Sequence, residues 1–168
     1  GIDDVKIGMV EHLLSAIAGL GIDNLYIDIE HEELPIMDGS ASPYIFLLQS
    51  AGIKEQKEAE KVFFVVKKKI LVGDSDQYCS IEPHNGFRVE FKIEFDHPLF
   101  NADNQTAIFD FSSTTYLTSL CRARTFGFEK DHELYLQQNL ALGSSLDNAV
   151  VLGENSIMND RGLRYYDE

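Results

Sequence analysis

A glutamate and a histidine stand side by side near the start of a segment with apolar periodicity, at Glu11 and His12. A neutral imidazole binds zinc, and a nearby carboxylate can take a proton from zinc-bound water. The pair does not belong to a His-Glu-x-x-His motif, and no second ligand stands three or four residues further along the chain. Taken alone, the pair therefore favours an ordinary, partly buried histidine over a metal ligand.

The remaining histidines, serines and cysteines show no spacing typical of a metal site or a nucleophile. The four further histidines stand alone, and a Gly-x-Ser-x-Gly motif is absent from the sequence. Two cysteines, Cys79 and Cys121, are too few for a disulfide framework, which predicts a reduced, cytoplasmic setting. A disulfide between these two residues remains the alternative.

The charge balance limits the classes of partner. The 168 residues carry 28 acidic and 14 basic side chains, a formal net charge of −14. Such a surface repels nucleic-acid phosphates and anionic lipid headgroups, so we expect neither as a partner. The longest apolar runs fall well below the roughly 18 residues that a membrane span needs, and the sequence therefore predicts no transmembrane segment. An anionic small molecule would need a local basic patch, for which residues 67–69 and Arg122 with Arg124 are candidates.

The first third of the chain predicts a helix, a strand and a second helix. Apolar residues at positions 10, 13, 14 and 17 follow helical spacing, which predicts a helix over residues 9–20 that ends at Gly21. Strict alternation over residues 24–31 predicts a strand buried on one face. Ser42 and Gly52 stand where the cap and the end of a second helix are expected.

A charged stretch without apolar periodicity, residues 54–60, predicts a linker, and strand patterns dominate beyond it. Asn85 and Gly86 are typical of a tight turn, which predicts a hairpin between the strands on either side. The order of elements indicates an α+β fold rather than an alternating α/β fold. Strands are predicted over residues 62–72, 78–82, 87–95, 106–111 and 148–152, and helices over residues 112–120 and 131–139.

Three separated segments together resemble one enzyme family. They are residues 10–52, which contain Val-Glu-His-Leu and Ile-Met-Asp-Gly-Ser; residues 122–128, Arg-Ala-Arg-Thr-Phe-Gly-Phe; and residues 162–168, which contain Gly-Leu-Arg-Tyr and end in Asp167-Glu168. The sequence Asp-His-Pro at residues 96–98 also fits. On these motifs the chain resembles the UDP-3-O-acyl-N-acetylglucosamine deacetylases, the zinc amidases of lipid A synthesis, over essentially its whole length.

The resemblance implies an α+β fold of two-layer domains, each a sheet packed on helices as a sandwich, with the zinc site between the domains. Residues 1–53 would form the C-terminal part of the first domain, residues 54–60 a linker, and residues 61–168 the N-terminal part of the second domain with a βαβ insert. The family has strands upstream of these residues, and zinc ligands in a His-Lys-x-x-Asp segment downstream of them. We therefore expect the 168 residues to be a portion of a longer enzyme, inactive by itself.

The resemblance also implies roles for single residues. Glu11 would be the general base, and His12 a zinc ligand. Thr125 would help to hold the oxyanion of the tetrahedral intermediate. Phe126 would pack on the sugar, and Phe95 would contact the uridine diphosphate end of the substrate.

The βαβ insert, around residues 131–151, would form the passage for the acyl chain. His132 and Asn148 depart from the apolar residues that the resemblance leads us to expect there. The further substrate contacts that the resemblance implies are the ring of Phe128 and the small side chains of the passage, Ala141, Ser144, Ala149 and Val151.

Two functions from different classes follow. The first is zinc-dependent hydrolysis of the acetamide of a UDP-3-O-acyl-N-acetylglucosamine substrate, with release of acetate. The alternative is a catalytically silent fragment that only binds the acyl chain or the nucleotide sugar. His12 alone would not hold zinc tightly, because zinc sites normally use three or four ligands. The sequence predicts neither the oligomeric state nor the preferred length of the acyl chain.

Overall fold

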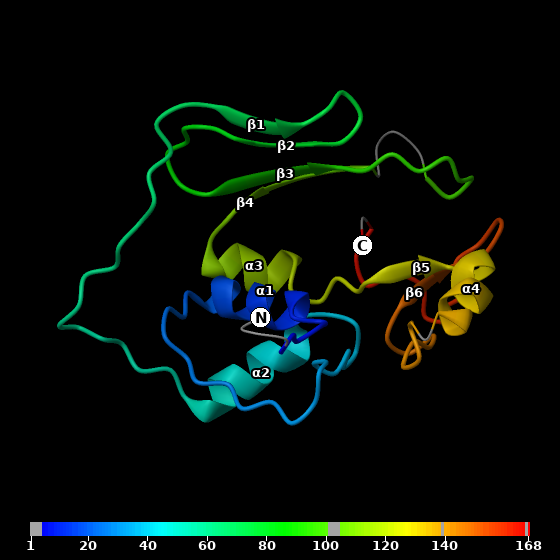
Figure 1. The fold of residues 1–168 in the computed structure, drawn as a ribbon, viewed down its shortest axis with the longest axis horizontal. Helices are drawn as coiled ribbons and strands as arrows, with labels where there is room; N and C mark the ends of the chain where they lie inside the picture. Colours follow the sequence, from blue (N-terminus) through cyan, green and yellow to red (C-terminus); the bar gives the residue numbers. More distant parts are fainter. Residues whose placement is uncertain (1–4, 101–104, 139, 167) are drawn as a thin grey trace.

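The computed structural model describes residues 5–100, 105–138, 140–166 and 168. Within them lie helices and short strands in a mixed order, which confirms an α+β fold. Figure 1 shows the helices at residues 11–20, 42–51 and 113–119 gathered together, with the strands of residues 70–81 and 88–110 on one side of them and the strands and helix of residues 126–152 on another. The elements are α1 (Glu11–Leu20), α2 (Ser42–Ala51), β1 (Ile70–Gly73), β2 (Tyr78–Ile81), β3 (Arg88–Lys92), β4 (Thr106–Asp110), α3 (Ser113–Ser119), β5 (Phe126–Phe128), the 3₁₀ helix η2 (Glu129–Asp131), α4 (His132–Gln137) and β6 (Val150–Leu152).

Helix α1 ends at Gly21, as the sequence predicts. Gly21 adopts the left-handed conformation with a φ of 69°, and its N–H donates to the carbonyl of Ala18 at 3.1 Å. The buried face of α1 is narrower than its periodicity suggests, because Leu13 is buried while Leu14 is 55% exposed. The helix therefore directs one apolar stripe at α2 and α3, which are its packing partners.

The core of the molecule lies among the first three helices. Tyr116 of α3 lies against Gly19 of α1, where a Cβ would overlap the tyrosine ring. The Tyr116 hydroxyl also shares a hydrogen bond of 2.6 Å with the Ser15 hydroxyl, so the buried phenol is satisfied. The buried members of this core are Leu13, Ala16, Leu34, Ala41, Tyr44, Ile45, Tyr116 and Cys121.

Helix α3 is the element whose start the sequence predicts best. The Ser112 side chain accepts a hydrogen bond from the backbone N–H of Thr115, and the Thr115 hydroxyl accepts one from the backbone N–H of Ser112. This reciprocal pair is a capping box, which satisfies two backbone donors that the helix itself leaves free. Strand β4 leads directly into the cap, so β4 and α3 are joined without a loop of any length.

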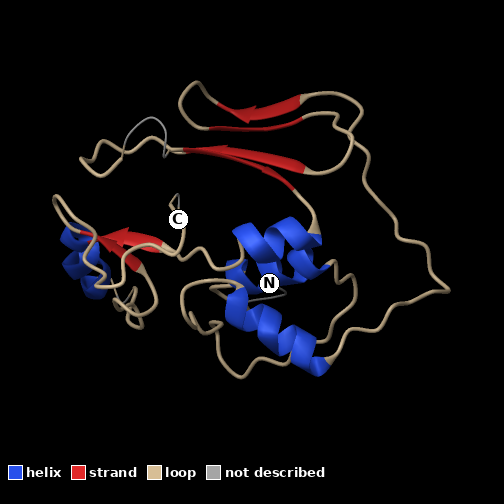
Figure 2. Ribbon diagram, turned by 180° about the vertical axis from the view of Figure 1, so that it is seen from behind, coloured by secondary structure: helices blue, strands red, loops and turns tan. Residues whose placement is uncertain are grey.

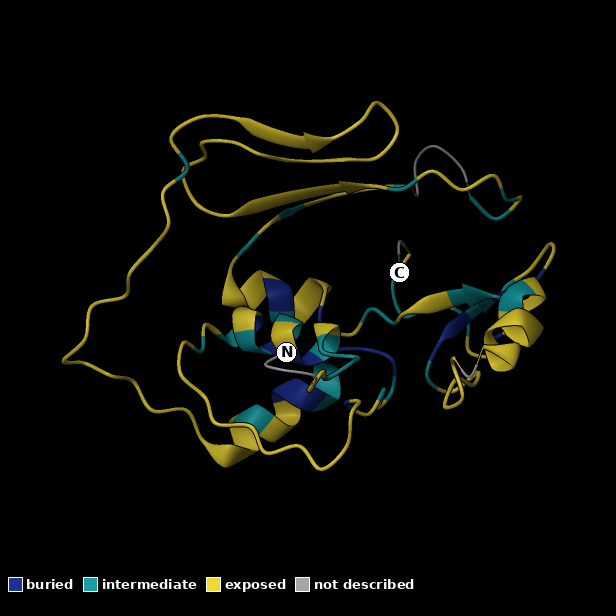
Figure 3. Ribbon diagram, in the orientation of Figure 1, coloured by how far each residue is buried: buried dark blue, intermediate teal, exposed yellow. Residues whose placement is uncertain are grey.

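The strands form three separate two-stranded sheets, and the predicted hairpin at Asn85 and Gly86 is wrong. Strand β2 pairs with β1 rather than with β3, because the Asp74 side chain accepts hydrogen bonds from the N–H groups of Asp76 and Gln77 and closes a tight turn between β1 and β2. Strand β3 pairs antiparallel with β4. Figure 3 shows both ladders almost entirely exposed, so the structure does not confirm a sheet packed on helices as a two-layer sandwich.

One predicted strand is absent in the structure, and several others are shorter than predicted. Residues 24–31 contain no strand, and their alternating apolar side chains are exposed. Alternation predicts a strand only where a neighbour supplies the ladder hydrogen bonds, and no described segment pairs with these residues. Of the predicted strand at 62–72, only the end forms β1.

The unit that contains β5 and β6 has the connectivity expected of the βαβ insert. Strands β5 and β6 run parallel, in register from Phe126 opposite Val150 to Phe128 opposite Leu152, with η2 and α4 between them. The predicted helix over 131–139 is shorter in the structure, and its last residue, Asn139, lies outside the described residues. Seen from behind in Figure 2, this unit lies beside the three-helix core and is joined to it by loops.

Candidate functional site

Glu11 and His12 are the first two residues of α1, at the end of the helix where free backbone N–H groups gather. The Glu11 side chain is 62% exposed and the His12 side chain only 13%, and Nε2 of His12 lies 4.0 Å from Oε1 of Glu11. The carboxylate therefore reaches solvent while the imidazole lies largely against the protein. An exposed carboxylate at this position can accept a proton from a water molecule.

The start of α1 is held by a short backbone bridge to the loop that precedes α2. The N–H of Gly8 donates to the Glu32 carbonyl at 2.8 Å, and the N–H of Leu34 donates to the Gly8 carbonyl at 3.2 Å. Met9 then turns the chain into the helix with a φ of 53°, a conformation that residues other than glycine rarely adopt. The bridge and this turn together fix where the helix begins.

The described residues do not form a complete metal site. Within residues 5–100, 105–138, 140–166 and 168, no three or more His, Cys, Asp or Glu side chains cluster closely enough to hold a metal ion. His12 offers one imidazole, whereas a catalytic zinc normally has three protein ligands. His12 therefore has the chemistry of a single ligand rather than of a whole site.

Thr125 lies directly before β5 and is held through its backbone on both sides. Its N–H donates to the Gly39 carbonyl at 2.8 Å, and its carbonyl accepts from the N–H of Val150 at 2.9 Å. The residue is exposed, and its hydroxyl has no hydrogen-bond partner among the described residues. A fixed backbone that presents a free hydroxyl suits a donor to an oxyanion. Among the described residues, no hydrogen bond or ion pair joins Thr125 to Glu11 or His12.

Gly39 is required at this junction by a close approach of two backbones. Its φ is 81°, and a Cβ at this position would overlap the carbonyl oxygen of Asn148. Because glycine alone tolerates both conditions, the loop before α2 can lie directly against the segment that leads into β6. Thr125 therefore lies at the junction of the helical core and the βαβ unit, with its backbone bonded to both.

A buried ion pair precedes Thr125 in the chain. The Arg124 guanidinium donates to both carboxylate oxygens of Glu168, from Nε at 2.8 Å and from Nη2 at 2.9 Å, and the two side chains are only 6% and 0% exposed. The backbone N–H of Arg124 donates to the same carboxylate at 2.8 Å. The guanidinium also donates to the Gly162 carbonyl at 2.8 Å. These bonds tie residues 162–168 to the segment that carries Thr125.

The sequence alone predicts no role for this ion pair, although both partners lie in the motifs that carry the family resemblance. Arg124 and Glu168 are 44 residues apart, so no local spacing predicts their contact. Only the chemistry of the residue types could have indicated the pair: a buried arginine requires a carboxylate partner, and bidentate pairing fixes the geometry of the two groups. Asp167, which precedes Glu168 in the motif, lies outside the described residues.

Three predicted substrate contacts meet in one aromatic cluster. The ring of Phe95 lies 5.7 Å from that of Phe126 and 5.5 Å from that of Phe128, measured between ring centroids. Phe100 and His97 join the same cluster, at 5.4 Å from Phe95 and 5.2 Å from Phe128 respectively. The cluster connects the segment after β3 with β5, so residues about 30 positions apart present one aromatic surface next to Thr125.

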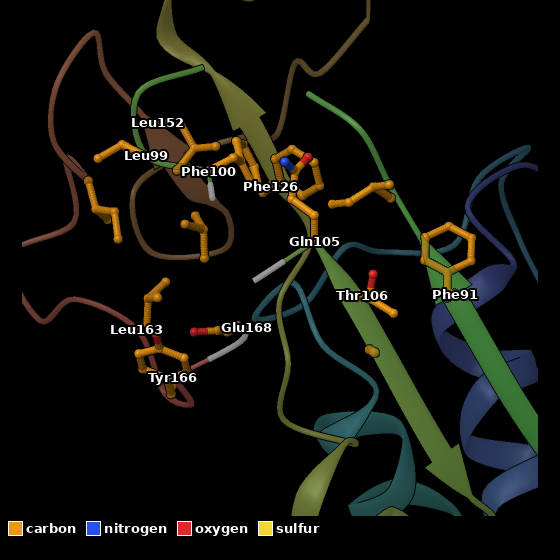
Figure 4. A pocket seen from close by; sticks show the side chains of 14 residues that line it. Phe91, Leu99, Phe100, Gln105, Thr106, Phe126, Leu152, Leu163, Tyr166 and Glu168 are labelled. Carbon is orange, nitrogen blue, oxygen red and sulfur yellow. The ribbon is translucent and has the colours of Figure 1, made fainter. Parts of the chain in front are cut away.

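An apolar cavity of about 200 Å³ opens beside this cluster. Figure 4 shows side chains from β3, β4, β5, β6 and the C-terminal segment pointing into it, with the Glu168 carboxylate at one edge. From β6, the lining residues are Val150 and Leu152. Ala149 and Val151 do not line it, because successive residues of a strand face opposite sides.

The residues predicted to line an acyl-chain passage lie in two places. Ala149 is buried and Val151 is half-buried; the Asn159 side chain accepts from the Val151 N–H at 2.9 Å and donates to the Ala149 carbonyl at 2.7 Å. Ala141 and Ser144 are exposed in the loop before β6. The structure therefore separates this set, and a role for the four residues in binding an acyl chain stays a prediction.

Neither cysteine forms a disulfide. Cys79 is exposed in β2 and Cys121 is buried in the helical core, and both are free thiols. Burial raises the pKa of the Cys121 thiol, and the positive charge of Arg122 only partly offsets this effect. The thiol is therefore a packing group and not a nucleophile.

The whole chain, residues 1–168, matches the model of one protein family, described as UDP-3-O-acyl N-acetylglycosamine deacetylase. Curated proteins with the corresponding name, UDP-3-O-acyl-N-acetylglucosamine deacetylase, are similar throughout. One from Coxiella burnetii is 58% identical over 165 residues, or 98% of this chain, and one from Alcanivorax borkumensis is 56% identical over 166 residues, or 99%. A third, from Methylococcus capsulatus, is 53% identical over 165 residues.

The chain spans only about half the length of these relatives, 54% in each case. None of the helices in the described ranges is long and apolar enough to cross a membrane.

Proposed function

Because this chain belongs to the UDP-3-O-acyl N-acetylglycosamine deacetylase family, we propose that a protein of the relatives' length containing it hydrolyses the acetamide of UDP-3-O-acyl-N-acetylglucosamine. The reaction releases acetate and a free amine, and serves lipid A synthesis in the cytoplasm. The observation that carries the proposal is the placement of two groups suited to amide hydrolysis: an exposed carboxylate beside an imidazole at a helix start, and a free hydroxyl on a fixed backbone.

In this proposal Glu11 is the general base. Its exposed carboxylate accepts a proton from the water that attacks the acetamide carbon. Thr125 donates a hydrogen bond from its free hydroxyl to the oxygen that becomes negative as the water adds. The two residues thus act on opposite partners of the same step, the nucleophile and the carbonyl.

The cofactor of the proposed reaction is zinc, with His12 as one of its ligands. A bound zinc ion supplies Lewis-acid polarisation and makes water easier to deprotonate. The described residues supply one imidazole and so do not complete the site. We place the other ligands in the part of the full-length relatives that this chain does not span.

The substrate would be held mainly through apolar contacts. Phe95, Phe126 and Phe128 form a connected aromatic surface beside Thr125, where a sugar ring and a uracil ring could pack. The small side chains Ala141, Ser144, Ala149 and Val151 would leave room for the acyl chain. No nucleic acid takes part, since the net charge of −14 opposes phosphate-backbone binding.

A second function is a binding fragment without catalysis, and the incomplete metal site favours it for the 168 residues taken alone. We propose that the isolated chain binds the nucleotide sugar or the acyl chain weakly but does not hydrolyse the acetamide. An assay of acetate release by the isolated chain in added zinc tests this directly. Zinc-dependent turnover by residues 1–168 would contradict it.

The experiment for the first function uses a protein of the relatives' full length that carries these residues. His12→Ala is expected to lower bound zinc to well below one ion per chain and to abolish deacetylation. A catalytic zinc normally has three protein ligands and a water, so the variant would leave only two protein ligands. His84→Ala is the matched control, since His84 is exposed in a turn between strands. Unchanged zinc content in His12→Ala would refute its role as a ligand.

A further inference from the structure

Arg164 connects three segments that are distant in the sequence. Its Nη1 lies 3.0 Å from Oδ2 of Asp38 and donates to the Arg122 carbonyl at 2.9 Å. Its backbone N–H donates to Oε2 of Glu168 at 2.6 Å. One residue therefore contacts the loop before α2, the segment that leads to Thr125, and the carboxylate that holds Arg124.

Asp38, the first of these contacts, is fixed to the helical core. Its second carboxylate oxygen, Oδ1, accepts hydrogen bonds from the N–H of Ser40 at 3.1 Å and from the Ser40 hydroxyl at 2.8 Å. Ser40 is fully buried, and its hydroxyl accepts in turn from the N–H of Ser42 at the start of α2. Because α2 packs on α1, Asp38 moves with the helix that carries Glu11.

The second and third contacts of Arg164 reach the segment of Thr125. The Arg122 carbonyl lies three residues before Thr125, and the Glu168 carboxylate binds the backbone and the side chain of Arg124, which directly precedes it. The segment that carries the free hydroxyl is thus held by Arg164 from the side of the C-terminal segment. Gly39 and Val150 hold it from the other sides.

We propose that Arg164 is a positioning residue, which sets where the Thr125 hydroxyl lies relative to the helix that carries Glu11 and His12. This inference rests on the proposed function. Among the described residues, Arg164 is the one whose side chain contacts both Asp38, through an ion pair, and the Arg122–Arg124 segment, through the Arg122 carbonyl. Arg164 acts through Thr125 and has no role of its own on the substrate.

The geometry explains why a small displacement would affect the rate. A hydrogen bond to a developing oxyanion requires a donor within about 0.3 Å of its best distance. Misplacement of a reacting or stabilising group by about 1 Å can cost on the order of 10²-fold in rate. Loss of the Arg164 contacts frees the Thr125 segment on one side, while its backbone bonds to Gly39 and Val150 still form but open more often. The chain is thereby expected to fold but to present the hydroxyl less accurately.

The test uses Arg164→Gln in a full-length protein that carries these residues. The Arg164 and Asp38 side chains are 23% and 35% exposed, so their loss is tolerated better than loss of the fully buried pair. We expect kcat to fall about 10- to 100-fold, with the KM changed by less than roughly threefold and with zinc content unchanged. Asp38→Asn is expected to give the same pattern. Arg164→Lys should restore part of kcat, because it keeps the charge but cannot bridge Asp38 and Arg122 with a planar fork.

The matched control is Arg88→Gln, which breaks another Arg–Asp pair. Arg88 lies 3.5 Å from Asp110 on the exposed β3–β4 ladder, and neither residue lines the cavity. This variant is expected to keep kcat within roughly twofold of the unmodified protein. An Arg164→Gln variant whose kcat equals that of Arg88→Gln, even with lower thermal stability, would overturn the proposal, since the ion pair would then be structural only.

A double variant shows whether Arg164 works through Thr125. If it does, adding Arg164→Gln to Thr125→Val lowers kcat by less than roughly twofold, because the donor to be positioned is already gone. The same fold-loss in both backgrounds would overturn the proposal.

Amide hydrogen exchange separates this inference from the proposed reaction. The Thr125 N–H, bonded to Gly39, is expected to exchange about tenfold faster in Arg164→Gln than in Arg88→Gln. If the unmodified protein shows no deacetylation, the proposed function fails while this measurement still decides the positioning. Equal exchange at Thr125 in the two variants would overturn the positioning whether or not the protein is a deacetylase.

Discussion

At the scale of single residues, Glu11 is defined by three features: it is the first residue of α1, it is exposed, and it lies 4.0 Å from the imidazole of His12. A general base contributes typically 10²- to 10⁴-fold to a rate. We therefore expect Glu11→Gln to lower kcat by about 10²- to 10⁴-fold while zinc content and KM are retained, because the amide keeps the size of the side chain but cannot accept the proton.

The control for Glu11→Gln is Glu133→Gln, which changes an exposed acid in the first turn of another helix, α4. Both variants remove one negative charge from a helix N-terminus, so they lose the same interaction with the helix dipole. Steady-state kinetics on both proteins isolates the contribution to catalysis. A loss in Glu11→Gln that appears only in KM would assign this residue to substrate binding instead.

The Glu168 carboxylate makes the stability of the site sensitive to acid. Burial raises the pKa of this carboxyl, but hydrogen bonds from the Arg124 side chain and from the backbone N–H groups of Arg164 and Arg124 outweigh it, so the pKa lies below its ordinary 4.5. A lowered pKa means that the unfolded chain binds the proton more readily than the folded one. The stabilisation that ionised Glu168 gives the folded chain is therefore present above about pH 4.5. It is lost as the pH falls through the lowered pKa that Glu168 has in the folded chain.

This linkage predicts a difference between Glu168→Gln and the unmodified protein in urea unfolding. At pH 7 the variant should be less stable by about 3 kcal/mol, because the buried Arg124 loses its charge partner. The difference should shrink as the pH falls below about 4.5 and Glu168 becomes protonated in the unmodified protein. Glu154→Gln, an exposed acid, serves as control. A difference that stays constant over this pH range would show that the carboxylate charge does not contribute.

Residue by residue, the sequence predicts the polar groups of the site better than their contacts. Glu11, His12 and Thr125 were found through motifs, and the structure shows an exposed carboxylate, a largely buried imidazole and a free hydroxyl at these positions. The pairing of Arg124 with Glu168 could not be predicted, because it depends on how segments 44 residues apart fold onto each other. The roles of Glu11, His12 and Thr125 in catalysis stay predictions.

At the scale of elements, the contact between Gly39 and Asn148 joins the helical core to the βαβ unit. Gly39→Ala is expected to lower the free energy of unfolding by about 3 kcal/mol, since it adds a left-handed penalty of 1–2 kcal/mol and an overlap with a backbone carbonyl. Gly21→Ala carries the left-handed penalty alone, because only the end of the Lys61 side chain lies near its added Cβ. We expect about 1 kcal/mol for that variant.

Chemical denaturation of both glycine variants separates the two effects. Because Gly39 also accepts the Thr125 N–H, its variant should lose deacetylation more than stability alone explains. Equal losses of stability in the two variants would mean that the loop before α2 shifts without cost, and that the backbones at this junction are not rigidly held.

Helices that carry their own capping residues were predicted correctly, whereas two strand predictions made from local patterns alone were not. Helices α1 and α3 carry their own termination and capping residues, Gly21 and Ser112, and both form as predicted. The alternating segment at 24–31 and the Asn85-Gly86 turn carry equally clear local patterns. Both predictions were wrong, because strand pairing is decided by which neighbour supplies the ladder and not by the pattern itself.

At the scale of the whole molecule, two surface properties oppose each other. The net charge of −14 keeps copies of the chain apart. Large apolar side chains are exposed on residues 62–65 and along β1, and Phe63 and Phe64 are 70% and 104% exposed. Exposed apolar side chains in this number favour association. Added salt weakens the charge repulsion, because charges further apart than the Debye length, about 8 Å at physiological ionic strength, are largely screened. The apolar contacts are not weakened in this way.

We therefore expect the isolated chain to associate reversibly, and more strongly as salt is added. Each buried phenylalanine contributes roughly 1.5–3 kcal/mol, so Phe63→Ser with Phe64→Ser should weaken association by at least about tenfold. Tyr26→Ser is the control, since Tyr26 is also fully exposed but lies outside residues 62–65 and β1. Sedimentation velocity at several salt and protein concentrations measures the effect. A chain that stays monomeric at high salt would mean that its apolar surface is too dispersed to form a contact, and the exposed side chains of residues 62–65 would then have no part in assembly.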